Sequence, residues 1–123
     1  MKPWIKLESC NKNDLPQTTQ VISDEAGHTF KCKFKEYTKI VNFEYPRLLR
    51  KITHQNFGVK ILQEQELDQE TWLFKATESD LIDWFNWQCC DIRKGGYDHF
   101  ILLTDTEVWQ ILSLEDPTIT LQQ

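Results

Sequence analysis

The segment HTFKCKFKEY, residues 28–37, constrains the fold of this chain more than any other part of the sequence. Three apolar side chains alternate with three lysines, and this period of two is typical of a strand with one buried and one solvated face. The apolar residues are Phe30, Cys32 and Phe34, and the lysines are Lys31, Lys33 and Lys35. The segment therefore predicts a half-buried strand with a cationic outer face.

Other segments extend this strand into a sheet. A short connection around Thr38 and Lys39 predicts that KIVNFEY returns as the second arm of a hairpin. Further strands are expected wherever apolar residues alternate with polar ones or β-branched and aromatic residues gather. These are WIKLE (4–8), VKILQEQEL (59–67), ETWLFKA (70–76) and HFILL (99–103). The polar segment NKNDLPQTTQ (11–20) is expected to be a loop.

Two helices are predicted from a different spacing of apolar residues. In residues 45–58 the apolar stripe has helical spacing, Pro46 suits a first helical turn, and Gly58 can terminate the helix. The stripe consists of Tyr45, Leu48, Leu49 and Ile52. A second helix is expected over residues 78–91, capped by Thr77 or Ser79.

The segment TDTEVWQILSLE, residues 104–115, fits two structures. Thr104 and Glu107 have the spacing of a capping box, whereas VWQIL could equally return as a hairpin strand. Val108, Ile111 and Leu112 share a helical face, which favours a helix, and a short strand can follow at residues 119–121. The predicted fold is α+β, a single domain over residues 1–123. Its antiparallel sheet has about five strands, with two or three helices packed mainly on one face.

Several classes of protein are not expected. No stretch approaches the roughly 20 apolar residues of a membrane span, and the N-terminus does not resemble a secretory signal, so a cytoplasmic protein with reduced thiols is expected. No C-x-x-C pair occurs, which argues against a zinc site. We expect no cofactor, no metal and no catalytic residue.

Charge is divided unevenly along the chain, whose net charge is −5. Residues 31–60 carry 8 Lys and Arg against 2 Asp and Glu, whereas residues 61–123 carry 3 against 13. Such a division can give a dipolar molecule that steers charged partners toward one face.

The predicted helix over residues 78–91 places an aromatic residue where polar residues belong. On a helical wheel Leu81, Phe85 and Cys89 face the core, whereas Trp87 falls on the opposite side. Exposed tryptophans often dominate binding interfaces. We therefore expect a non-enzymatic protein that binds a protein partner through an acidic surface carrying a tryptophan, in the manner of a small inhibitor or immunity protein. The expected contact residues are Asp83, Trp87, Arg93, Lys94, Tyr97, Asp98 and His99.

Two alternatives stay open. A nucleic-acid-binding protein could use the basic segment, because phosphate backbones match such a surface. Its residues would be Lys31, Lys33, Lys35, Arg47, Arg50 and Lys51. A small thiol-dependent enzyme could use Cys90 with His99, although a thiolate near a helix C-terminus is disfavoured by the helix dipole.

Overall fold

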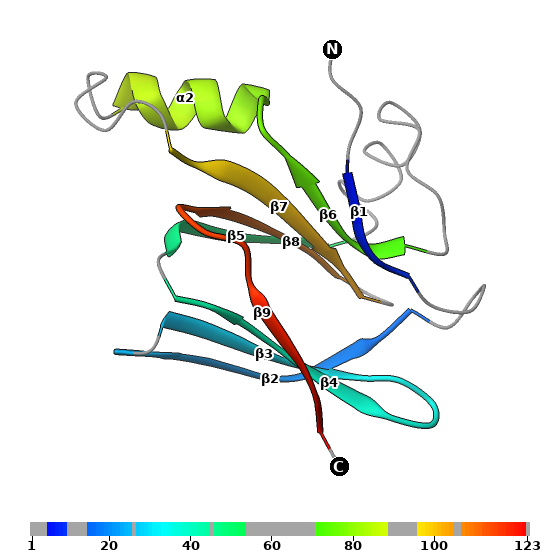
Figure 1. Ribbon diagram of the computed structural model, residues 1–123. Coiled ribbons are helices and arrows are strands. Elements are labelled where there is room, and N and C mark those ends of the chain that lie inside the picture. Colours follow the sequence, from blue (N-terminus) through cyan, green and yellow to red (C-terminus); the bar gives the residue numbers. More distant parts are fainter. Residues whose placement is uncertain are drawn as a thin grey trace.

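The computed structural model describes residues 5–9, 15–25, 27–44, 46–53, 71–88, 96–104 and 107–122. Within these ranges the chain forms nine strands and one helix (Figure 1). The strands are β1 (Ile5–Ser9), β2 (Gln17–Asp24), β3 (Gly27–Lys33), β4 (Thr38–Phe43), β5 (Pro46–Thr53), β6 (Thr71–Ala76), β7 (Asp98–Leu103), β8 (Glu107–Ser113) and β9 (Thr118–Gln122). The helix is α2 (Asp80–Gln88).

The strands make two antiparallel sheets that pack face to face (Figure 1). One sheet has five strands in the order β1-β6-β7-β8-β5, and the other has four in the order β2-β3-β4-β9. The chain therefore passes between the sheets after β1, after β4 and after β8. Aromatic pairs join the two layers: the rings of Phe43 and Phe100 lie 5.3 Å apart, and those of Phe30 and Trp109 lie 5.2 Å apart. The main core is thus the space between the sheets.

Helix α2 forms a third layer over the opposite face of the five-stranded sheet (Figure 1). Leu81 and Ile82 are buried against Leu112 of β8, with Leu48 of β5 and Phe85 packed around them. The five-stranded sheet is therefore covered on both faces where the helix lies.

This architecture corrects the predicted fold class. The α+β fold with two or three helices on one sheet is wrong, because the described residues are mostly strand and contain one helix. Residues 46–53, predicted as a helix, form β5 at an edge of its sheet, where a leading proline such as Pro46 is tolerated. Leu48 packs toward α2 and Leu49 toward the core between the sheets. Burial on both faces made adjacent leucines resemble a helical stripe.

The same cause explains residues 107–113, where the helix that we favoured is β8. Val108 and Leu112 point to the α2 side of the sheet, and Ile111 packs between the sheets, so all three are buried in a strand. The spacing of Thr104 and Glu107 has a different use. The Thr104 hydroxyl accepts a hydrogen bond from the Glu107 amide at 2.8 Å, and the Thr104 amide donates to the Glu107 carbonyl at 2.9 Å. A supposed helix cap therefore closes the β7–β8 hairpin.

Other expectations fare better. The β3–β4 hairpin is confirmed, with Phe30, Cys32 and Phe34 buried, and so are strands at β1, β6, β7 and β9. The expected loop over residues 11–20 is wrong from Gln17 onward, where β2 begins. The strand predicted at 59–67 lies outside the described residues.

Candidate functional site

The outer side of α2 carries two tryptophans and two carboxylates. Trp87 is 71% exposed and Trp84 is 48% exposed, and Asp80 and Asp83 are exposed beside them. These four positions are spaced i, i+3, i+4 and i+7, so they share one side of the helix. We call this set, Asp80, Asp83, Trp84 and Trp87, the α2 outer stripe. The helix itself contains no Lys or Arg, so the charges on the stripe are all negative.

The inner side of α2 is anchored by contacts with His99 of β7 and with Tyr97, which directly precedes β7. Of the two predicted N-cap residues, Thr77 and Ser79, Ser79 caps the helix. Its hydroxyl accepts a hydrogen bond from the Ile82 amide at 3.2 Å. The same hydroxyl lies 2.8 Å from Nδ1 of His99 on β7. Phe85 stacks edge-on against Tyr97, with ring centroids 5.5 Å apart. These contacts hold the helix in one orientation, with its outer stripe turned toward solvent.

The residues predicted beside the helix do not join this surface. Tyr97 and His99 are buried, and Asp98 is half-buried in an ion pair. Arg93 and Lys94 lie outside the described residues. Of the predicted contact residues that the structure describes, Asp83 and Trp87 are therefore the two that lie on the exposed helix surface.

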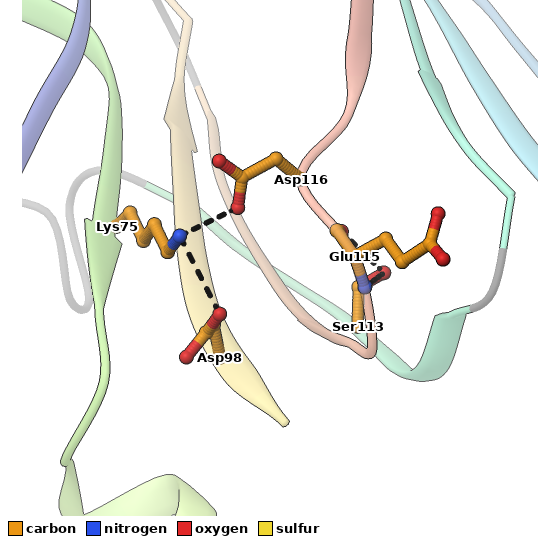
Figure 2. A network of polar contacts seen from close by, with 5 residues as sticks. All are labelled: Lys75, Asp98, Ser113, Glu115 and Asp116. Atoms are coloured by element: carbon orange, nitrogen blue, oxygen red, sulfur yellow. Dashed lines mark hydrogen bonds and ion pairs between the residues drawn. The ribbon is translucent and has the colours of Figure 1, made fainter. Parts of the chain in front are cut away.

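Asp98 instead belongs to a polar network that ties three segments together (Figure 2). Lys75 on β6 places its Nζ 3.5 Å from an Asp98 oxygen and 2.6 Å from an Asp116 oxygen. The hydrogen bond to Asp116 raises the pKa of Lys75. Next to it, the Ser113 hydroxyl donates to the Glu115 carbonyl at 3.0 Å (Figure 2). The network fixes the segment in which the chain leaves β8 for the other sheet.

His99 sits in a setting unsuited to general base chemistry near pH 7. His99 is buried, with a relative exposure of 3%, and burial lowers its pKa to about 3 with a further contribution from the positive charge of Arg50. A catalytic base works best when its pKa lies near the working pH. Cys90, its partner in the enzymatic alternative, lies outside the described residues. Cys32 is buried, and burial raises the pKa of its thiol to about 12.

The basic residues of the nucleic-acid alternative are not brought together. Lys31 and Lys33 project from the outer face of the four-stranded sheet, because Phe30 and Cys32, which alternate with them, point into the core. Arg50 projects from the outer face of the other sheet, where its Nε and Nη2 both donate to Oε1 of Gln110, at 2.9 and 2.5 Å. These two groups therefore lie on opposite faces of the sandwich.

The remaining basic candidates add little to either face. Lys51 pairs with Glu107 at 3.1 Å and lies over the ring of Trp109, 5.5 Å from its centroid. Lys35 is exposed in the β3–β4 turn, and the side chain of Arg47 lies outside the described residues.

Sequence reasoning missed Trp84 as a surface residue. A helical wheel puts Trp84 at the edge of the core face, so it was not among the predicted contact residues. A signal was present, because Trp84 precedes Trp87 by three residues and such pairs are neighbours on a helix surface. Asp80, four residues before Trp84, belongs to the same side by the same spacing.

Comparisons with known proteins give no match among family models, curated proteins or solved structures. Within the described ranges, no group of three or more His, Cys, Asp or Glu side chains could hold a metal ion. No helix in this part of the chain is long and apolar enough to cross a membrane.

Proposed function

We propose that this protein is a non-enzymatic binding protein that docks the α2 outer stripe onto a basic surface of a protein partner. The observation that supports this proposal most is the exposure of Trp84 and Trp87 on a helix that is otherwise well anchored. A tryptophan buries on the order of 150 to 250 Å² in total, of which Trp84 and Trp87 still expose 48% and 71%. A rigid helix presents this area with little loss of conformational entropy on binding.

The charge of the stripe defines the chemistry of the partner. Asp80 and Asp83 flank the tryptophans, with no cation on the helix to balance them. A complementary partner has a cationic groove with an apolar pocket at its centre, as in an enzyme that acts on nucleic acid. In that arrangement the carboxylates speed association and the indoles slow dissociation. An inhibitor or immunity-type role follows when the groove is the partner's active site.

The buried state of His99 favours binding over the enzymatic alternative. A histidine that stays neutral and enclosed is a poor base for activating a thiol. The contact of His99 with Ser79 instead anchors the N-terminus of α2 to β7.

The proposal is tested by comparing Trp87→Ala and Trp84→Ala with a matched control, Ile22→Ala. Ile22 is also a large exposed apolar residue, at 42%, but it lies on β2 in the other sheet. The wild type and the three variants are immobilised, and the proteins that each captures from a lysate of the source cells are quantified by mass spectrometry. A partner retained by the wild type and by Ile22→Ala is then purified and titrated calorimetrically. Trp87→Ala is expected to weaken binding on the order of 30-fold, which corresponds to a hot-spot loss of about 2 kcal/mol.

Two results decide the outcome. Equal capture by wild type and by the double variant Trp84→Ala, Trp87→Ala would exclude the stripe as the docking surface. Replacing Asp80 and Asp83 by Asn should reduce the association rate and its dependence on salt, since these carboxylates act over a distance. The free energy of unfolding of each variant is measured by urea denaturation, so that a loss of binding is distinguished from a loss of stability.

A further inference from the structure

The two sheets have four edge strands, and these edges are not alike. Among the described residues, β1 and β5 border the five-stranded sheet, and β2 and β9 border the four-stranded sheet. An edge strand presents unpaired backbone amides and carbonyls that can accept a strand from another chain. Proteins usually prevent this with charged side chains, proline or irregular backbone at the edge.

Three of the edges carry such protection. Strand β1 contains Lys6 and Glu8 and has two shifts of register against β6. Strand β2 has a register shift between Thr18 and Gln20. Strand β5 begins with a proline, has a register shift near it, and carries cationic side chains along its length.

Strand β9 carries none of these features. Its sequence TITLQ contains no charged residue and no proline, and it pairs with β4 in an unbroken register from Thr118 to Gln122. Leu121 is 58% exposed on it, although Leu121 has the same orientation as Ile119, which packs against the core. The edge is regular, uncharged and apolar on one side, which are the properties that favour strand addition.

We propose that a second copy of this chain occupies this edge, with the two β9 strands antiparallel about a twofold axis at Thr120. In that register Ile119 of one copy lies opposite Leu121 of the other. The exposed leucine of each copy therefore gains an apolar neighbour, and the contact occurs twice in the dimer. Thr118 lies opposite Gln122 on the outer face. The two four-stranded sheets become one continuous sheet of eight strands.

The charges around the edge permit this pairing. Although the chain has a net charge of −5, β9 contains no charged residue, and the charged residues of β3 and β4 are the three lysines Lys31, Lys33 and Lys39. No like charges would therefore stand directly opposite each other between the two β9 strands. A strand pairing with its own copy also satisfies the requirement that both surfaces of a twofold interface be the same patch. This dimer leaves α2 uncovered, because the helix lies on the other sheet (Figure 1).

The test is sedimentation velocity over about 10 to 500 µM protein, a range suited to a modest interface. The wild type should show a monomer–dimer equilibrium. Leu121→Lys should raise the dimer dissociation constant about tenfold or more, because the charge is introduced twice in each dimer. Ile22→Lys is the matched control, since it places the same charge on the opposite edge of the same sheet and should leave dimerisation unchanged.

A measurement on the unmodified protein covers the case in which Leu121→Lys fails to fold. Amide hydrogen exchange of residues 118–122 should slow as the protein concentration rises, whereas exchange of residues 17–24 in β2 should not. The proposal is overturned by a wild type that is monomeric throughout, by species larger than a dimer, or by an equal effect of the two lysine variants. Trp87→Ala should leave the dimer intact, so this test and the test of the α2 outer stripe can fail separately.

Discussion

Replacement of His99 by Gln should remove much of the acid sensitivity of this protein. In the unfolded chain His99 has its ordinary pKa of 6.5, whereas burial and the charge of Arg50 lower its pKa to about 3 in the folded protein. Below pH 6.5 the unfolded chain therefore binds a proton that the folded protein does not. The stability that a neutral His99 allows is fully present above pH 6.5, and it is lost as the pH falls toward 3.

The size of the effect follows from the two pKa values. One pKa unit corresponds to about 1.4 kcal/mol, so the linkage between pH 7.5 and pH 5.0 amounts to about 2 kcal/mol for this one residue. Wild type and His99→Gln would be unfolded with urea at both pH values, followed by tryptophan fluorescence. The wild type should lose about 2 kcal/mol more than the variant. His99→Gln has its own cost at pH 7.5, but that cost cancels in the difference between the two pH values.

A second histidine supplies the control. Burial also lowers the pKa of His28, whose Nδ1 lies 2.6 Å from the Ser23 hydroxyl, so His28 contributes acid sensitivity of the same sign. His28→Gln should leave the His99 contribution in place. If wild type and His99→Gln lose the same stability, the imidazole is protonated inside the folded protein and the argument from burial fails. Should the variant not fold, an NMR titration of the wild type should show the His99 ring unprotonated at pH 5.

Two further predictions concern the backbone and the basic residues. Gly27→Ala should destabilise the protein by about 3 kcal/mol, because its φ is +101° and a Cβ there would lie 1.9 Å from the Phe43 carbonyl oxygen. Gly96→Ala should cost only about 1 kcal/mol, since φ is +81° but the nearest atom is 3.5 Å from the added Cβ, and urea unfolding measures both. Filter binding of duplex DNA at low and moderate salt should show at most weak retention, because Lys31 and Arg50 lie on opposite faces. Tight binding with a steep salt dependence would revive the nucleic-acid hypothesis.

The sequence predicted β3 from its period of two, and β6 and β7, which are buried on both faces, from their β-branched and aromatic residues. Phe30 and Cys32 alternate with solvated lysines, so the period of two is visible without the structure. The period disappears where α2 covers the outer face of the five-stranded sheet. There Leu48 and Leu49 are both partly buried, on opposite faces of the sheet, and neighbouring apolar residues in a strand then look like part of a helix. The fold class was wrong because burial on two faces is a tertiary property.

The candidate site was predictable to the same extent. Helical spacing alone placed Trp87 away from the core, and it is exposed. Tyr97 and His99 are buried because the helix packs over β7, where Phe85 contacts Tyr97 and Ser79 contacts His99. No local pattern encodes that packing.

The order of strands has a consequence for how the chain acquires its structure. Strand β5 pairs only with β8 among the described residues, and Leu49 is separated from its partner Ile111 by more than half of the sequence. Strand β1 is likewise far in sequence from its partner β6, since Ile5 pairs with Lys75. Long separations of this kind slow folding, because a large loop must close before the contacts form. During synthesis on the ribosome, β5 has no partner strand until residues 107–113 emerge, and an unpaired strand with exposed apolar side chains is prone to aggregation in that interval.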